Sequence, residues 1–324
     1  MSAPPAARLL VTGAAGFIGS HVCEALVARG QDVIGVDNFD PFYARSVKER
    51  NLEPLRATRA FRLIEADVAR DPLPLDGVAA VLHLAAKAGV RPSLEHPAAY
   101  IDANVTGTAR VLDAARRAGV GRVVLGSSSS VYGEATPAPF VEDAPAVAPI
   151  SPYAASKRAA ELLGHAFAHL YPVRIVCLRF FTVYGPRQRP DLAIHRFTDL
   201  IARGQPVRMY GDGSSERDYT YISDAVDGVL AALARTGEAG GGFEVLNVGG
   251  GARVRLDRLI ALLGAALGRE PRVERHPDQP GDVRLTAADL RRAEQALGYR
   301  PRVGIEEGIR RFVRWYEETH GHQS

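Results

Sequence analysis

Two side chains four residues apart form the clearest chemical pattern in the sequence, Tyr153 and Lys157 of the segment Tyr-Ala-Ala-Ser-Lys. Residues i and i+4 of a helix lie on the same face, so the phenol and the ammonium group would face the same space. A nearby positive charge favours the phenolate, but proton transfer at neutral pH requires the pKa of a free tyrosine to fall by roughly 3 units. The same spacing occurs on the surface of ordinary helices, so it predicts a proton-transfer site only in combination with other motifs.

A glycine-rich segment near the N-terminus is the second chemical pattern. Gly13, Gly16 and Gly19 follow the apolar residues 9–11 and precede a segment of helical period. Strand, glycine turn and helix in this order predict a pyrophosphate cradle, because backbone N–H groups and the positive dipole end of a helix starting near Phe17 would bind the phosphates. The spacing departs by one residue from the common dinucleotide-binding fingerprint, so a purely structural turn stays an alternative.

A carboxylate follows the second predicted strand. Residues 31–36 form this strand, and Asp37 comes directly after it. Asp37 lies about 20 residues beyond the glycines, the separation at which an acidic residue binds a ribose 2′-hydroxyl in dinucleotide-binding folds. No arginine directly follows Asp37, so the sequence favours NAD over NADP as the cofactor.

Composition and charge argue against several classes of protein. A chain of 324 residues can form one or two domains with a large core, and a net charge of +3 is too small to indicate a nucleic-acid partner. No apolar run approaches the ~20 residues of a membrane-spanning helix, and the 9 histidines show no metal-ligand spacing. We expect Cys23 and Cys177 to be small core residues rather than a disulfide, which fits a cytoplasmic protein.

Strands and helices alternate along the first half of the chain, which predicts an α/β fold with a Rossmann-type doubly wound parallel sheet covered on both faces. The predicted strands are residues 9–11, 31–36, 60–66, 79–84, 122–126 and 173–178, and the predicted helices start near residue 17 and span 44–56, 98–118 and 153–170.

Beyond residue 179 this alternation loosens. We expect a polar loop over 211–219, a strand over 243–248 and helices over 194–202, 256–267 and 305–319. Residues 1–180 with about 221–249 would form the Rossmann domain, and residues 181–220 with 250–324 a smaller C-terminal α/β lobe that binds the substrate.

Together these features resemble the extended short-chain dehydrogenase/reductase family, and within it the NAD-dependent nucleotide-sugar epimerases and dehydratases. The resemblance extends over nearly all residues from 8 to 318. The matching motifs are Thr12–Gly19, Asp67-Val68, His83–Ala86, Asn104, the serine run before Val131-Tyr132-Gly133, Tyr153-x-x-x-Lys157, Arg179–Pro186, Gly211-Asp-Gly213, Arg217–Tyr219 and Gly281-Asp282.

The resemblance implies a role for individual residues, with Ser128 assisting the catalytic Tyr153 and Lys157. It implies that NAD is bound by Gly13, Gly16, Phe17, Ile18, Gly19, Asp37, Asn38, Asp67, Val68, Leu84, Ala85, Ala86, Asn104, Tyr153 and Lys157. It implies that a UDP-sugar is bound by Arg91, Ser128, Ser129, Ser130, Thr182, Arg189, Tyr210, Arg217, Gln279 and Asp282. A loop ion pair for Arg217 and a core aromatic position for Tyr210 stay open as alternatives.

The nearest resemblance is to UDP-glucuronate 4-epimerases, through the segments 37–43, 87–93, 127–133 and 179–190. It implies that Tyr153 accepts the proton of the sugar O4 while NAD takes hydride from C4, and that hydride returns to the opposite face of a rotated 4-keto sugar. Arg187 and Arg189 could bind a sugar carboxylate through a bidentate pair, or could belong to a solvated basic loop.

Several alternatives remain at the level of sequence. Other nucleotide-sugar enzymes of the family are hexose 4-epimerases, 4,6-dehydratases and decarboxylases, and a non-catalytic NAD-binding scaffold would be a different class. Decarboxylases and dehydratases of the family carry acidic residues where this chain has Ser129 and Ser130. The family also implies a homodimer, with the helices over 98–118 and 153–169 pairing with their copies.

Overall fold

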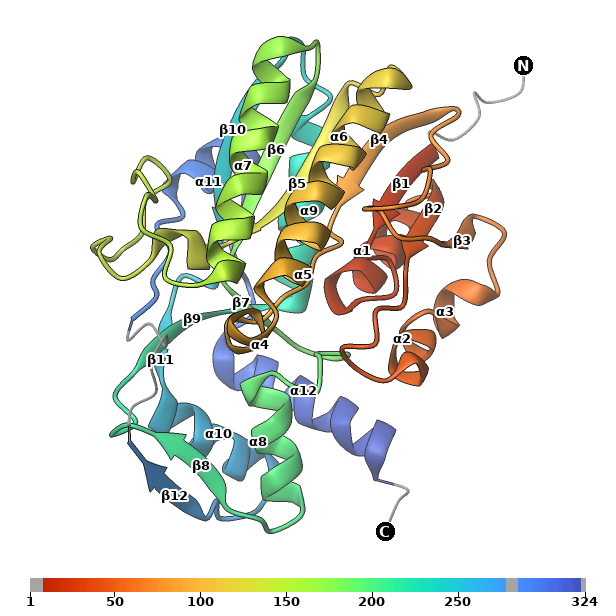
Figure 1. Cartoon of the computed structure of the whole chain (residues 1–324). Helices are drawn as coiled ribbons and strands as arrows, with labels where there is room; N and C mark the ends of the chain where they lie inside the picture. The colour runs from red at the N-terminus through yellow and green to blue at the C-terminus, as the bar shows by residue number, and fades with distance from the viewer. Residues whose placement is uncertain (1–7, 278–284, 322–324) are drawn as a thin grey trace.

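The computed structural model describes residues 8–277 and 285–321 of the chain. A seven-stranded sheet forms the larger part of the molecule (Figure 1), and every pair of neighbouring strands in it is parallel. The strand order β3-β2-β1-β4-β5-β6-β10 confirms the predicted doubly wound fold. The strands are β1 (Arg8–Thr12), β2 (Asp32–Asp37), β3 (Phe61–Glu65), β4 (Val78–His83), β5 (Arg122–Ser128), β6 (Arg174–Phe180) and β10 (Gly242–Val248).

Helices cover both faces of this sheet, which explains why its strands read as continuous apolar runs. Successive residues of a strand point to opposite faces. In β1, Leu9 and Val11 belong to one buried cluster, and Leu10 belongs to another on the opposite face. The first cluster includes residues of α1 (Phe17–Val27) and α9 (Ile222–Arg235), and the second includes residues of α6 (Gly107–Arg117) and α7 (Pro152–Leu170).

Besides α9 and β10, the described residues of the second half form four helices and two small sheets. The two small sheets are drawn below the large sheet in Figure 1. One sheet has the order β11-β9-β7, and the other pairs β12 with β8. These elements are β7 (Thr182–Tyr184), α8 (Ala193–Ala202), β8 (Val207–Tyr210), β9 (Glu216–Tyr221), β11 (Arg253–Arg255), α10 (Leu256–Leu267), β12 (Val273–His276), α11 (Arg291–Leu297) and α12 (Ile305–His320).

Some sequence-based boundaries were wrong. The loop expected over 211–219 contains the start of β9, whose polar residue Asp218 is buried and accepts N–H bonds from Gly250 and Ala288. Long-range partners of this kind leave no local apolar alternation to detect. Three α-helices of the described residues, α4 (Val90–Glu95), α9 and α11, were not expected. The helix expected over 44–56 divides into α2 (Arg45–Asn51) and α3 (Glu53–Arg56).

The helix expected over 98–118 is also interrupted. It consists of α5 (Pro97–Ile101), a π-helical turn η1 (Asp102–Thr106) and α6, with the short helix α4 (Val90–Glu95) before it. Asn104, one of the predicted site residues, lies in the π-helical turn and is buried. A π-helical turn inside an α-helix frequently marks a functional site, but no sequence period reveals it.

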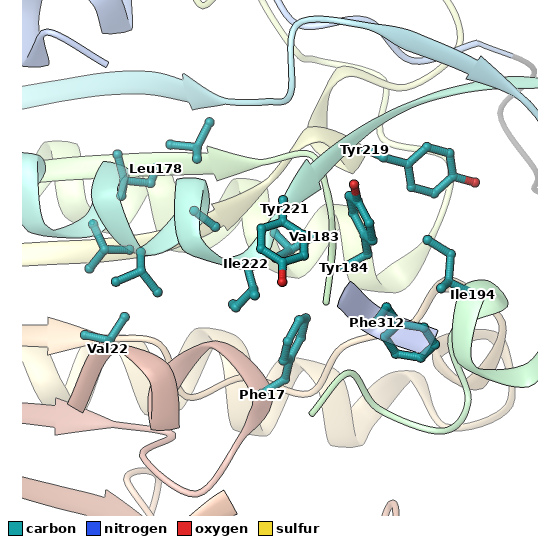
Figure 2. Close-up of a cluster of buried hydrophobic side chains, with 14 of the residues drawn as sticks. Phe17, Val22, Leu178, Val183, Tyr184, Ile194, Tyr219, Tyr221, Ile222 and Phe312 are labelled. Atoms are coloured by element: carbon teal, nitrogen blue, oxygen red, sulfur yellow. The ribbon is translucent and has the colours of Figure 1, made fainter. Parts of the chain in front are cut away.

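An aromatic and aliphatic cluster connects the large sheet with the elements of the second half (Figure 2). Phe17 at the start of α1 and Ile222 at the start of α9 belong to the same buried cluster as Tyr184 of β7. The ring of Tyr184 meets the rings of Tyr221 and Tyr219 edge-on, at centroid distances of 5.5 and 6.0 Å. The segment that follows β7 therefore starts from a rigid, fully buried position.

Candidate active site

The glycine turn between β1 and α1 is too closely packed to hold a side chain at two of its glycines. Gly13 has φ +71°, and a Cβ atom there would lie 2.8 Å from the backbone nitrogen of Ala85. A Cβ atom on Gly19 would overlap the carbonyl oxygen of Gly13. Gly16 is the N-cap of α1, so the N–H groups of Phe17 and Ile18 lie in the first turn, where they have no helical partner. Backbone N–H groups in such a position can bind an anion, and the contact of this turn with a pyrophosphate stays a prediction.

Asp37 ends β2 and holds the glycine turn from the side. Its Oδ2 accepts a hydrogen bond from the Ala15 N–H (3.0 Å), and its Oδ1 accepts one from the Phe39 N–H (2.8 Å). The ammonium group of Lys48 lies 3.6 Å from Oδ1, and both side chains are almost fully buried. Lys48 was not among the predicted site residues, because nothing in its local sequence pattern indicates a partner on β2.

Other predicted cofactor residues lie at neighbouring strand ends. The Asn38 amide donates to Asp67 Oδ2 (3.3 Å), and the Ala69 N–H donates to Asp67 Oδ1 (2.8 Å). Burial raises the pKa of Asp67, but these bonds and the bond from Arg70 outweigh it and hold that pKa below its ordinary value. Val68 follows Asp67, and the remaining predicted residues, Leu84, Ala85 and Ala86, follow β4. The carboxyl ends of parallel strands are the usual ligand-binding edge of such a sheet.

The amide of Asn104 is engaged entirely within the protein. Its Nδ2 donates to the Lys87 carbonyl (2.9 Å) and to Ser156 Oγ (2.8 Å), and its Oδ1 accepts from the Lys87 N–H (2.8 Å). The π-helical turn thus joins the segment after β4 to α7. Direct contact of Asn104 with a cofactor stays a prediction, whereas its role in positioning Lys87 and Ser156 is visible.

Tyr153 lies in the first turn of α7, whose N-cap Ser151 accepts a hydrogen bond from the Ala154 N–H (3.1 Å). The pKa of Tyr153 is raised above its ordinary value. Burial of the phenol is the largest cause, and a hydrogen bond with Ser128 and the positive charge of Arg189 act in the opposite direction. We expected the pKa to be lowered by Lys157, so both the net direction and the cation were wrong.

Lys157 lies farther inside, behind the end of β5. Its ammonium group donates to the carbonyl of Gly126 (2.8 Å), and the residue is 7% exposed. Burial lowers the pKa of Lys157 to about 8, while the negative charges of Glu161 and of Cys177, where that thiol is ionised, act in the opposite direction. The bond to Gly126 ties α7 to the strand that ends at Ser128.

Hydroxyl groups gather where β5 ends. Ser128 is the N-cap of the 3₁₀ helix η2 (Ser129–Tyr132), and its Oγ accepts a hydrogen bond from the Ser130 N–H (3.2 Å). The same Oγ lies 3.1 Å from Ser130 Oγ. Serine hydroxyls donate and accept hydrogen bonds but do not ionise at neutral pH. The position therefore offers polar contacts without a carboxylic acid.

The two candidate arginines of the basic segment after β7, Arg187 and Arg189, bind different partners. Arg187 forms an ion pair with Glu24 of α1 (2.7 Å). Arg189 binds Asp191 through Nε (2.9 Å) and Nη2 (2.7 Å), and its guanidinium carbon lies 5.2 Å from the ring centroid of Phe42. Of the two, Arg189 is the cation whose charge acts on Tyr153. Asp191 and Glu24, the partners of these two arginines, were not among the predicted site residues.

The remaining predicted substrate residues lie on several elements. The Arg91 guanidinium of α4 lies 5.3 Å from the ring centroid of Tyr210 on β8, which brings two of them together. Arg217 is part of β9 and not of a loop, and its Nη1 donates to the Glu216 carbonyl (3.1 Å). Thr182 begins β7. Gln279 and Asp282 lie outside the described residues.

Comparison with known proteins decides the family. A sequence profile of the NAD dependent epimerase/dehydratase family matches residues 9–249. The chain belongs to this family. The motif-based recognition is therefore confirmed, and the epimerase/dehydratase match covers the glycine turn, the serine run and the Tyr153–Lys157 helix.

Within the epimerase/dehydratase family, the chain is similar to several individual proteins. The chain is 40% identical over 316 residues to a UDP-glucuronate 4-epimerase from Thermodesulfobacterium geofontis, with 96% of each chain covered. It is similar to a crystal structure of UDP-glucuronic acid 4-epimerase from Bacillus cereus in complex with UDP-glucuronic acid and NAD (35% identity, TM-score 0.92, 97% and 100% covered). A dTDP-glucose 4,6-dehydratase from Streptomyces venezuelae is similar too (34% identity, TM-score 0.88, 97% and 98% covered). The fold alone thus does not separate epimerase from dehydratase.

Within the described residues, no group of three or more His, Cys, Asp or Glu side chains could hold a metal ion. In the same part of the chain, no helix combines the length and apolar character needed to cross a bilayer.

Proposed function

We propose that this protein is an NAD-dependent 4-epimerase that interconverts UDP-glucuronate and UDP-galacturonate. The observation that carries the substrate class is the position of Arg189, a largely buried guanidinium whose charge acts on Tyr153. A sugar carboxylate bound to this cation would bring C4 of the same ring close to the phenol. The epimerase relatives support the same substrate, since the Bacillus cereus enzyme was crystallised with UDP-glucuronic acid and NAD.

The proposed mechanism gives each residue one task. The glycine turn binds the pyrophosphate, Asp37 binds the adenosine ribose, and Asp67 contacts the adenine. When bound, NAD supplies a reversible hydride acceptor at C4 of the sugar. Tyr153 accepts the O4 proton and returns it, and Ser128 holds the phenolic oxygen in place. Lys157 acts in its protonated form, as a compact positive charge that would bond a ribose of the cofactor. Residues 181–220 and 250–324 would bind the UDP portion.

The serines explain why the reaction would end in epimerisation. Oxidation of glucuronate at C4 creates a β-keto acid, which loses carbon dioxide easily. Ser129 and Ser130 cannot act as acids or carboxylate bases at neutral pH, so they give no help to decarboxylation or to dehydration. Their hydroxyls, with Thr182, would instead hydrogen-bond the carboxylate held by Arg189.

The decisive experiment incubates the purified protein separately with UDP-glucuronate, UDP-glucose and UDP-galactose and follows the products by NMR. We expect UDP-galacturonate from UDP-glucuronate with little UDP-pentose, and slow turnover of the neutral sugars. A UDP-pentose as the main product would indicate a decarboxylase, and equal use of UDP-glucose a hexose 4-epimerase. No turnover of any sugar by protein that contains NAD would favour a binding scaffold.

We also propose a cytoplasmic homodimer. Cys23 and Cys177 are free and buried, which fits a reducing compartment. Leu162 of α7 and Ile101 of α5 are 55% and 45% exposed, and they would be covered by the same helices of a second copy.

A further inference from the structure

A buried carboxylate, Glu161, lies on α7 one helical turn beyond Lys157. Tyr153, Lys157 and Glu161 follow one another at intervals of four residues, so they share one face of the helix. Glu161 is 0% exposed. An ionised group is kept at such a position only where partners compensate for the loss of water.

The partners of Glu161 come from both strands beneath the helix. Its Oε1 accepts hydrogen bonds from Ser127 Oγ (2.6 Å) and Arg179 Nε (2.8 Å), and its Oε2 accepts one from Arg179 Nη2 (2.8 Å). Ser127 and Arg179 face each other in the register of β5 and β6. Arg158, on the same helix, adds a bond to Oε2 (2.8 Å). One carboxylate therefore connects α7 to the carboxyl ends of two strands.

Arg179 extends the connection toward the substrate side. It is 1% exposed, its Nη1 donates to the Glu142 carbonyl (3.3 Å), and its guanidinium carbon lies 4.6 Å from the ring centroid of Tyr132 in η2. Tyr132 in turn donates to Asn247 of β10 (2.7 Å). A bidentate arginine–carboxylate pair fixes direction as well as distance, so these elements cannot slide past one another.

We propose that Glu161 is a positioning residue of the active site, whose pair with Arg179 sets the Tyr153–Lys157 face of α7 against Ser128 at the end of β5. Ser128 follows Ser127 directly, so a shift of α7 relative to β5 would lengthen the contact between Ser128 and Tyr153. The inference rests on the proposed function, because it assumes that Tyr153 and Ser128 act on the sugar.

The charge of Glu161 has a second consequence at Lys157. The ionisable neighbours that influence Lys157 are His83 of β4, Cys177 of β6 and Glu161 on its own helix. Burial lowers the pKa of His83 to about 3, and burial raises that of the Cys177 thiol, so both are neutral near pH 7. Burial by itself would raise the pKa of Glu161. The hydrogen bonds and the positive charge of Arg179 outweigh the effect of burial, so the pKa of Glu161 is lowered and its carboxylate is ionised. Arg179, which binds Glu161 directly, is the remaining charge on the adjacent strand. Glu161 is thus the anion that helps Lys157 stay protonated.

The test is the isosteric variant Glu161→Gln, assayed with UDP-glucuronate over a range of pH. We expect kcat to fall by about 10²-fold, the loss typical of a small misplacement of reacting groups, while KM changes less than about threefold. Without the negative charge the pKa of Lys157 falls, so the alkaline limb of the kcat profile should move to lower pH by on the order of one unit. If Glu161 had a purely structural role, its replacement would lower the thermal stability but would leave the alkaline limb of the kcat profile at the same pH.

Two further variants keep the test decisive. Glu161→Gln leaves the Arg179 charge buried without its partner, so the double variant with Arg179→Met removes both charges and guards against failure to fold. It should bind NAD normally and still show the lower kcat. Asp224→Asn is the matched control, because Asp224 is a buried carboxylate on α9 that binds the Val303 N–H (3.0 Å), far from Tyr153 in the chain.

The outcomes separate the inference from the proposed function. Absence of UDP-glucuronate turnover in the wild type refutes the proposed function itself. If the wild type is active and folded Glu161→Gln keeps its kcat within twofold and its alkaline limb unmoved, the inference on Glu161 is wrong and the function stands. The same holds if Asp224→Asn reproduces the pH shift.

Discussion

At the residue scale, three influences set the behaviour of the Tyr153 phenol. Burial raises its pKa, whereas Ser128 and the charge of Arg189 lower it. A phenolate base is active only above its pKa, so the proposed reaction depends on the two groups that oppose burial. Neither the serine bond nor the arginine is adjacent to Tyr153 in the chain, which is why the tyrosine–lysine spacing alone led to the wrong cation.

Tyr153→Phe removes the proton acceptor and leaves the ring in place. We expect turnover of UDP-glucuronate to fall by at least about 10²-fold, the usual contribution of a positioned acid–base group. Fold and bound NAD should be retained, as measured by circular dichroism and by nucleotide release on denaturation. Turnover close to that of the wild type would contradict the assignment of Tyr153.

Arg189→Ala should discriminate between charged and neutral sugars. Loss of a charged contact costs about 1.5–3 kcal/mol, so kcat/KM for UDP-glucuronate should fall roughly 10- to 150-fold more than that for UDP-glucose. The share of UDP-pentose should also rise, because the carboxylate is no longer held. Arg187→Ala is the matched control, since Arg187 pairs with Glu24 in the same segment. Equal losses for both sugars would refute the carboxylate contact.

The same variant predicts a pH effect of defined sign. Arg189 lowers the pKa of Tyr153, so its removal should raise that pKa. Residual activity of Arg189→Ala on UDP-glucose should then appear at higher pH than in the wild type, measured on the acid limb of kcat/KM. If the acid limb of Arg189→Ala stays at the wild-type pH, or if that of Arg187→Ala moves by the same amount, the charge of Arg189 does not influence the pKa of Tyr153.

At the element scale, the sequence predicted those helices, strands and turns that depend on interactions between neighbouring residues. The β1–glycine–α1 unit and α7 were recognised because apolar period, glycine spacing and helix length are all encoded within a few residues. The π-helical turn at Asn104 was not recognised from the sequence, because it depends on the contacts of Asn104 with Lys87 and Ser156. The ion pairs of Asp37 with Lys48 and of Arg187 with Glu24 join distant segments and have no local signal.

Asp37 links two elements, and this makes its replacement informative. Asp37→Asn removes the charge that binds the Ala15 and Phe39 N–H groups and, by our proposal, the ribose. We expect NAD affinity to fall by about 1.5–3 kcal/mol, measured by calorimetry on protein stripped of nucleotide. Glu65→Gln, an exposed carboxylate on β3, is the control. If Asp37→Asn binds NAD as tightly as the wild type does, Asp37 does not contact the ribose. If Asp37→Asn shifts the preference toward NADP and Glu65→Gln does not, the ribose contact is supported.

At the scale of the whole molecule, the chain crosses between its two parts more than once. Residues 242–248 return to the edge of the large sheet as β10, after β7, β8 and β9 have formed the small sheets. The expected grouping of 221–249 with the Rossmann domain follows this path, although the domain division itself stays a prediction. The apolar cluster around Tyr184 joins the two parts, so ligand-binding groups from both can be held in fixed relation (Figure 2).

The outer face of α7 carries an exposed apolar residue that a second copy of the chain could cover. Leu163 and Phe167 pack against the buried cluster beneath the helix, whereas Leu162 is 55% exposed. Ile101 of α5 and Leu94 of α4 are 45% and 54% exposed, and α4 and α5 both contact α7. Exposed apolar side chains grouped on neighbouring helices gain about 25 cal/mol per Å² when a partner covers them.

Light scattering at micromolar concentration should therefore give the mass of a dimer. Leu162→Glu with Ile101→Glu should give a monomer, because each copy would bury two charges without partners. Val273→Glu, on an exposed apolar residue of β12, is the control and should stay dimeric. A monomeric wild type, or a dimer that survives both glutamates, would place the interface elsewhere.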